Sequence, residues 1–271
     1  MATIPASQKL RPLETSVEKF GETRFIGLEI ETTINRKSTP TEVYEDDNMN
    51  KREDFRRLVD PDDKVLANAG YDGGEMEVAT EPLARSLIYN NDVWVDKLLK
   101  NIEMYGIADS RSGTHVHISK LKKENKNLWR NLYWFSVVFD KQFYAIFRRK
   151  SNWALSPKEY FKERTRVYGP KLSIKDVCQH RYPNFGNKGT LIVKRDKTYE
   201  CRAGSSSTNP VEIRAWAILF YNIVEFCNQT SILGHRFEEV LPASSELKNV
   251  IESRLTGEQL RQIVPDYIYI N

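Results

Sequence analysis

Four short segments of the chain alternate apolar and polar side chains with a period of two, which is the pattern of half-buried β-strands. The clearest is "FIGLEIETT", part of an expected strand at about 24–34 whose apolar side chains share one face. The opposite face carries Glu29 and Glu31, although like charges repel and glutamate is depleted in strands. A fold that keeps both carboxylates on one face needs something to offset their repulsion.

Three later segments place ionisable pairs on one strand face in the same way: Glu75 with Glu77, His115 with His117, and Glu200 with Arg202. If all four strands belong to one sheet with helices on one side, these side chains line the other side. For a single strand, a simply solvated polar face is the more common explanation. Four such strands together favour a site, because acids predominate and few basic residues stand ready to balance them.

Apolar spacing typical of helices predicts helices over 84–105, over 124–150 and from Asn209 to about Asn228. Shorter helices are expected after Ser156 and after Thr256. Residues 189–204 predict a hairpin that turns near 195–197, and the end of the chain, "DYIYIN", is strand-like. The aromatic residues of the second helix are expected in the core: Trp129, Trp134, Phe135 and Phe139.

The polar stretch 35–64 has no clear apolar period and is expected to be an insertion, either a segment over a site or a surface loop. No strong boundary divides the rest, so residues 1–271 are expected to form a single domain. Lys194 and Arg195 are expected to be solvated at the hairpin turn. Arg214 is expected to pair with Glu212 or to cover the core.

The bulk composition predicts a soluble globular protein, with 271 residues, 40% hydrophobic and 29% charged. A net charge of +4 is too weak to indicate nucleic-acid binding, but it suits anionic substrates such as nucleotides. The three cysteines are scattered, which favours free thiols in a reducing compartment. No signal peptide or membrane-length apolar segment is seen, so a cytoplasmic protein is expected.

The type of side chain on the polar face selects the cation that would fit it. Carboxylates predominate and no cysteine pair is available, which favours Mg²⁺ or Mn²⁺. A zinc site built on His115 and His117 ranks below this, because zinc would need one further ligand rather than five acids. Divalent ions facing an arginine are typical of phosphoryl transfer.

The motifs "GLEIE", "EMEVATEPL", "SGTHVHIS" and "YECRAGSSSTNP", in this order, resemble the amidoligase family. These are carboxylate–amine ligases of the glutamine synthetase and glutamate–cysteine ligase superfamily, and the chain looks like a phage or bacterial member. The resemblance spans about residues 25–225. It departs from the family pattern at Ser112, where cysteine is frequent, at Gly73 and Gly74, and at Cys201, none of which is a presumed ligand.

The resemblance implies an α+β fold, with a curved, mainly antiparallel sheet and helices packed on one face. It also implies an ATP- and Mg²⁺-dependent (or Mn²⁺-dependent) enzyme that joins a small-molecule or peptide carboxylate to an amine through an acyl phosphate. Glu29, Glu31, Glu77 and Glu200 would be metal ligands, with Glu75 a weaker candidate. Arg202 would hold the transferring phosphoryl group and His117 would contact metal or phosphate. The nucleotide would further meet His115 and Arg111, although a turn arginine such as Arg111 is more often just solvated.

Two other functions fit the same residues. One is a kinase that phosphorylates a guanidine or carboxylate with the same metals and stops there. The other is a binding protein that keeps the fold without catalysis. A nucleic-acid-binding function is not expected, because it conflicts with an acidic sheet face.

Overall fold

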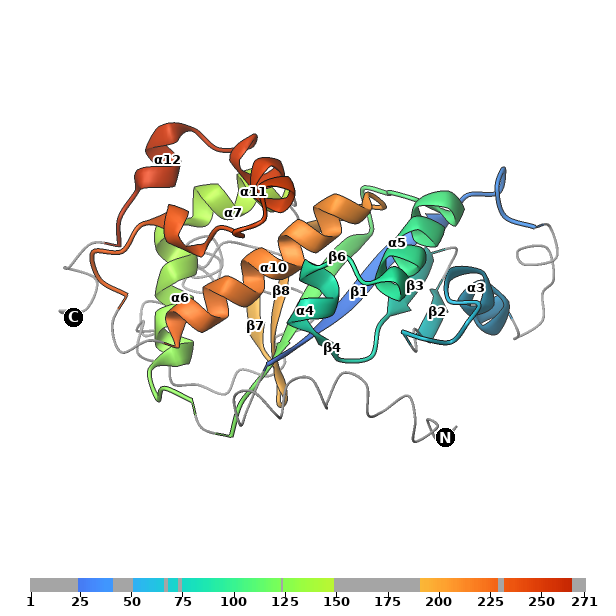
Figure 1. The fold of residues 1–271 in the computed structure, drawn as a ribbon, viewed down its shortest axis with the longest axis horizontal. Helices are drawn as coiled ribbons and strands as arrows, with labels where there is room; N and C mark the ends of the chain where they lie inside the picture. Colours follow the sequence, from blue (N-terminus) through green and yellow to red (C-terminus); the bar gives the residue numbers. More distant parts are fainter. Residues whose placement is uncertain are drawn as a thin grey trace, which may run out of the picture.

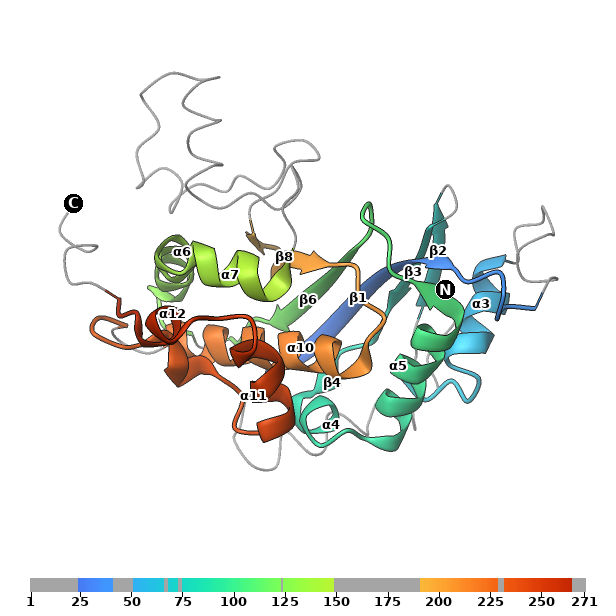
Figure 2. The ribbon, with the colours of Figure 1, turned by 90° about the horizontal axis from the view of Figure 1, so that it is seen from above.

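The computed structural model describes residues 24–40, 51–65, 68–72, 75–122, 124–148, 191–228 and 232–264. These ranges form an α+β fold in which helices pack on one face of a curved, open, antiparallel sheet (Figures 1 and 2). The expected fold class is confirmed. The helix expected after Ser156 and the strand-like end of the chain lie outside the described residues.

The sheet has the strand order β2-β3-β1-β6-β8-β7, and every pairing in it is antiparallel. Two short strands, β4 and β5, also pair with β1. The strands are β1 (Phe25–Ile34), β2 (Asn68–Asp72), β3 (Glu75–Ala79), β4 (Leu83–Ala84), β5 (Gly106–Ile107), β6 (Gly113–Ser119), β7 (Ile192–Lys194) and β8 (Thr198–Ser205). All four segments with ionisable pairs are therefore neighbours in one sheet, as β3, β1, β6 and β8.

Helix α10 lies along the helix-covered face of the sheet, with other helices beside it (Figures 1 and 2). The helical segments are α3 (Lys51–Val59), α4 (Arg85–Tyr89), α5 (Val93–Tyr105), α6 (Leu128–Val138), α7 (Asp140–Phe147), α10 (Pro210–Cys227), the 3₁₀ helix η1 (Phe237–Val240), α11 (Ser245–Glu252) and α12 (Gly257–Arg261). Helix α10 begins as predicted, because the Asn209 side chain accepts a hydrogen bond from the Glu212 amide at 3.0 Å.

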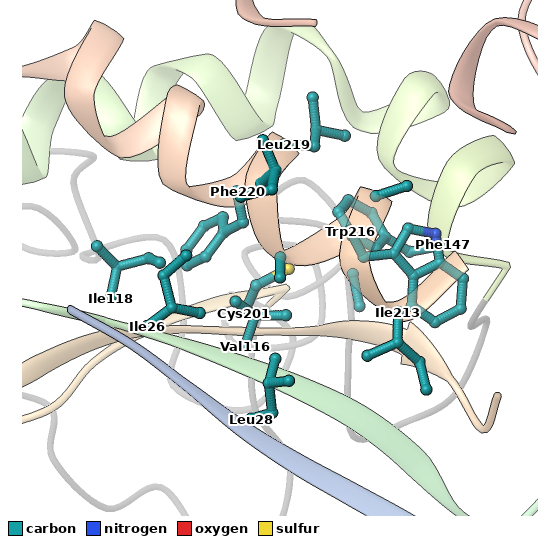
Figure 3. Packing of buried hydrophobic residues seen from close by; sticks show 14 of the residues in the cluster. Ile26, Leu28, Val116, Ile118, Phe147, Cys201, Ile213, Trp216, Leu219 and Phe220 are labelled. Atoms are coloured by element: carbon teal, nitrogen blue, oxygen red, sulfur yellow. The ribbon is translucent and has the colours of Figure 1, made fainter. Parts of the chain in front are cut away.

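The core lies between this helix and the alternate side chains of the central strands. Strand β1 alternates between buried and partly exposed residues along its whole length, as its sequence predicts. Figure 3 shows the packing that results, with α10 set against β1, β6 and β8. The facing residues include Ile26, Leu28, Val116, Ile118, Cys201, Trp216, Leu219 and Phe220. Burying this apolar face fixes the opposite face, with its ionisable side chains, toward the other side of the sheet.

Two of the expected helices are broken in the structure. The helix expected over 84–105 is interrupted at Asn91, which has a left-handed φ of 54°, and Asp92 then caps α5 by accepting from the Trp94 amide at 3.0 Å. The helix expected over 124–150 is interrupted at Phe139, whose ring lies 4.6 Å from that of Phe135. The side-chain cap at Asp92 accounts for the first break, and the apolar period reveals neither of the two. Phe135 and Phe139 are fully buried as expected, whereas Trp129 and Trp134 are only partly buried.

Helix α3 lies within the polar stretch 35–64, for which an insertion over a site or a surface loop is expected. No helix is expected there, yet Phe55 and Val59 of α3 are fully buried in the core. Five further elements were also missed, namely β2, β4, β5, η1 and α11. The sequence of β2, "NAGYD", has turn-forming residues and gains its strand conformation by pairing with β3.

Arg214 is buried, and its expected pairing with Glu212 is wrong. Its guanidinium donates to the carbonyl oxygens of Ile88 at 2.9 Å and Tyr89 at 3.2 Å, which lie at the end of α4. Free carbonyls at a helix C-terminus attract cations, so this arginine joins α4 to α10. Glu212 pairs with Arg254 instead.

Candidate metal and phosphate site

Strand register brings the ionisable side chains of the central strands opposite one another. Across β1 and β6, Glu29 faces His115, and across β6 and β8, His117 faces Glu200. On the other side of β1, Glu31 faces Glu77. The backbone of Glu75 lies opposite Thr33, and its side chain is outside the described part of the structure.

A β-bulge in β8 places Arg202 next to this group. Thr114 of β6 pairs with Gly204 and Val116 pairs with Cys201, so β8 has one extra residue opposite His115. The strands approach so closely here that a Cβ on Gly204 would lie 2.2 Å from the carbonyl oxygen of Thr114. Only glycine fits that position, and a bulge of this kind redirects the side chains beside it.

Glu29 is held by the two histidines of β6. Its Oε2 lies 3.1 Å from Nδ1 of His115, and its Oε1 lies 3.1 Å from Nε2 of His117. Burial alone would raise the pKa of Glu29, but its contacts with His115 and His117 outweigh this effect and hold the pKa well below its usual range. Glu29 is therefore a carboxylate at neutral pH.

Glu200 is a fully buried carboxylate with a guanidinium on each oxygen. Nη1 of Arg202 donates to Oε1 at 2.8 Å, and Nε of Arg195 donates to Oε2. Its side chain is 0% exposed, so without partners its charge would be costly. The expectation that few basic residues balance the acids is wrong for Glu200, and so is the expectation that Arg195 is simply solvated.

Three ligand atoms from adjacent strands converge at one point. One atom each from Glu29, His117 and Glu200 lie within 4.8 Å of one another, an arrangement that could hold a metal ion. Nε2 of His117 is buried and lies 3.1 Å from Oε1 of Glu29, without the geometry of a hydrogen bond. A buried ring nitrogen placed in this way beside two carboxylates fits a divalent cation with oxygen and imidazole ligands.

Glu31 and Glu77 lie farther along the same face and are not part of that convergent set among the described residues. Glu31 accepts a hydrogen bond from the Gly113 amide at 2.5 Å. Glu77 is exposed, and partial desolvation together with the charges of Glu29 and Glu31 raises its pKa. A raised carboxylate pKa beside other carboxylates indicates a place where a further positive charge would be favourable.

Arg111 lies in the turn before β6, and its guanidinium faces Asp109. The Asp109 carboxylate accepts from Nε at 3.1 Å and from Nη2 at 2.9 Å, and it also accepts from the Thr33 hydroxyl at 3.2 Å. Hydrogen bonds from Arg111 hold the pKa of Asp109 well below its usual range. Arg111 is thus an exposed arginine, held in place by Asp109, at the end of the polar sheet face where Glu31 lies.

Cys201 and Cys227 are free and buried, as their spacing predicts, and Cys178 lies outside the described residues. Burial raises the pKa of the Cys201 thiol to about 12. Neither described cysteine is a thiolate at neutral pH, which argues against nucleophilic roles for them.

Comparison with known proteins gives one structural resemblance to report. In sequence, the chain matches no family profile and no curated protein. Within the described residues, no helix is both long and apolar enough to span a bilayer. The structure is similar to a chain in the crystal structure of the complex between Prokaryotic Ubiquitin-like Protein Pup and its Ligase PafA, with a TM-score of 0.38 and 13% identity. The match covers 89% of this chain and 52% of that chain, so this chain spans about half the length of the protein it matches.

Proposed function

We propose that this chain is an ATP-dependent carboxylate–amine ligase that uses Mg²⁺ or Mn²⁺ and acts through an acyl phosphate. The observation that carries the proposal is the convergence of Glu29, His117 and Glu200 on one point of the sheet face. Arg202, on the same strand as Glu200, supplies a guanidinium beside them. We further propose that residues 1–271 form one such domain, in which the polar stretch 35–64 carries α3.

In this proposal the side chains of the candidate site have different roles. Glu29, His117 and Glu200 would hold the divalent ion, with Glu31 and Glu77 available farther along the face. The ion, when bound, offsets the charge of nucleotide phosphates. Arg202 uses one nitrogen on Glu200 and keeps further N–H donors for the phosphoryl oxygens. Candidate substrates are small-molecule or peptide carboxylates and amines.

An ADP-release assay with Mg²⁺ and a panel of carboxylates and amines tests the proposed activity. A ligase needs both substrates for rapid phosphate release, because the amine attacks the activated carboxylate. A kinase would release ADP from a single substrate without an amine. Absence of ADP release with every pair, from a protein that binds MgATP, would contradict the proposal.

A second candidate function is a binding protein on this fold that does not turn over ATP. One observation favours it, namely that both carboxylate oxygens of Glu200 already face guanidinium groups. Such a saturated ion-pair network can stabilise a fold without any ligand. Under this alternative neither Mg²⁺ nor Mn²⁺ would raise the melting temperature.

The two histidines of β6 are expected to differ in function. His117→Ala should remove most of the stabilisation by Mg²⁺ or Mn²⁺, because His117 and not His115 contributes a ring nitrogen to the convergent set. His115→Ala should mainly lower the melting temperature without metal, because its side chain is only 3% exposed and contacts Glu29. The measurement is thermal unfolding with and without each metal. If both variants lose metal stabilisation equally, and Zn²⁺ restores it whereas Mg²⁺ does not, a zinc site is favoured.

A further inference from the structure

Arg195 lies in the turn between β7 and β8 and extends back to the sheet face. Its backbone amide donates to the Thr198 carbonyl at 2.9 Å and closes the hairpin, while its Nε donates to Oε2 of Glu200. The side chain of Arg195 is 46% exposed and that of Glu200 is 0% exposed. The arginine therefore covers a buried carboxylate from the solvent side.

This contact puts a positive charge beside a carboxylate that the convergent set would use for a metal ion. Glu200 contributes one of the three convergent ligand atoms, and its two oxygens pair with Arg202 and Arg195. A dication brought to the same carboxylate would be repelled by both guanidinium groups. For the ion to interact with the full negative charge of Glu200, at least one of the two guanidinium groups has to move away.

Arg195 is the group able to withdraw. Its half-exposed side chain starts from a hairpin turn, so it can rotate into water at small cost. Arg202 is more enclosed, at 22% exposure, and starts from the sheet itself within the bulge. The hydrogen bond to Glu200, joined by the charge of Glu29, raises the pKa of Arg195, so both acidic residues of the convergent set act on this arginine.

We propose that Arg195 is an exchangeable counter-cation, which holds Glu200 when no metal is bound and is displaced by the divalent ion. The released guanidinium would then be available, beside Arg202, to bind phosphate oxygens of the nucleotide. This inference rests on the proposed metal site and adds Arg195 to it as a nucleotide-binding residue. It couples entry of the metal to a change in the β7–β8 turn.

The test compares Arg195→Ala with Lys194→Ala, a matched control that removes the same charge from an exposed neighbour in the same hairpin. Titration of Mg²⁺ or Mn²⁺ alone, followed by thermal unfolding, should show that Arg195→Ala binds the ion about fivefold more tightly than wild type, the upper range for a partly exposed ion pair. Lys194→Ala should stay within about twofold of wild type on the same reasoning. For MgADP the order should reverse, with Arg195→Ala binding more weakly than wild type.

If Arg195 had a purely structural role, Arg195→Ala would not bind the metal more tightly and MgADP more weakly at the same time. Weaker or unchanged metal binding in Arg195→Ala would overturn the inference while leaving the proposed function intact. An equal gain in metal affinity in Arg195→Ala and Lys194→Ala would also overturn it, because the loss of any one nearby positive charge would then be a sufficient explanation. Absence of metal binding in wild type and in both variants would overturn both the inference and the proposed function. Arg195→Gln, which keeps a hydrogen-bond donor, serves if the alanine variant does not fold.

Discussion

Glu29→Gln is expected to abolish the rise in melting temperature that Mg²⁺ or Mn²⁺ gives the wild-type protein. Glu29 is the proposed ligand that contacts both histidines, and glutamine keeps its shape while removing its charge. An ion at a hundred times its dissociation constant stabilises the native state by about 2.7 kcal/mol, which corresponds to roughly 5–10 °C for a chain of this size. We expect that shift in wild type and none in Glu29→Gln, as measured by thermal unfolding.

Without metal, the same variant should unfold at a lower temperature than wild type at neutral pH. The pKa of Glu29 is depressed in the native state, so its charge stabilises the fold at pH values above the unfolded-state pKa. That contribution is lost as the pH falls through the native pKa, where wild type and variant should converge. Glu103→Gln, an exposed change on α5, is the matched control and should keep the full metal shift. A full metal shift in Glu29→Gln would refute the metal site.

Arg202→Lys is expected to lower turnover about a hundredfold or more, comparable to the loss of a donor to a developing charge. Lysine keeps the charge beside Glu200, but it loses the planar fork that can hold Glu200 and a phosphoryl oxygen together. The affinity for ATP should fall much less, because this loss is largest in the transition state. Steady-state kinetics with the substrates found in the ADP-release assay provide the measurement.

The control for this change is Arg236→Lys, since Arg236 is exposed and paired with Glu238 at 3.2 Å in another part of the fold. It should leave turnover unchanged. If Arg202→Lys also turns over at a near-normal rate, Arg202 is a structural partner of Glu200. The phosphate-binding role would then have to be tested at Arg111 and Arg195.

The sequence predicts the strands of the site well, because period-two alternation depends only on which side of the sheet is buried. The alternation around Glu29 holds along the whole of β1, and the hairpin before Glu200 turns where expected. Pairing order and register do not follow from local pattern. That His115 faces Glu29 and that a bulge lies opposite His115 depend on contacts between segments far apart in the chain.

The role of Arg195 in the site likewise does not follow from the local sequence pattern. Its sequence context is a polar turn, in which arginine is ordinarily solvated, and no periodicity links it to Glu200. Only the tight hairpin, with Arg195 five residues before Glu200, brings the guanidinium back over the sheet. Helix α3 was missed for a related reason, because its buried residues stand among charged ones and gain their helical setting from packing against the core.

The strand order also has a consequence for how the chain reaches its native state. Strand β1 lies in the middle of the sheet although it is the first described element, and its partner β6 is completed only by β8. Contacts of such large sequence separation have a high loop-closure cost and are typical of slowly folding topologies. During synthesis, the edge of β6 therefore stays unpaired until β8 has left the ribosome, and until then it is open to pairing with other chains.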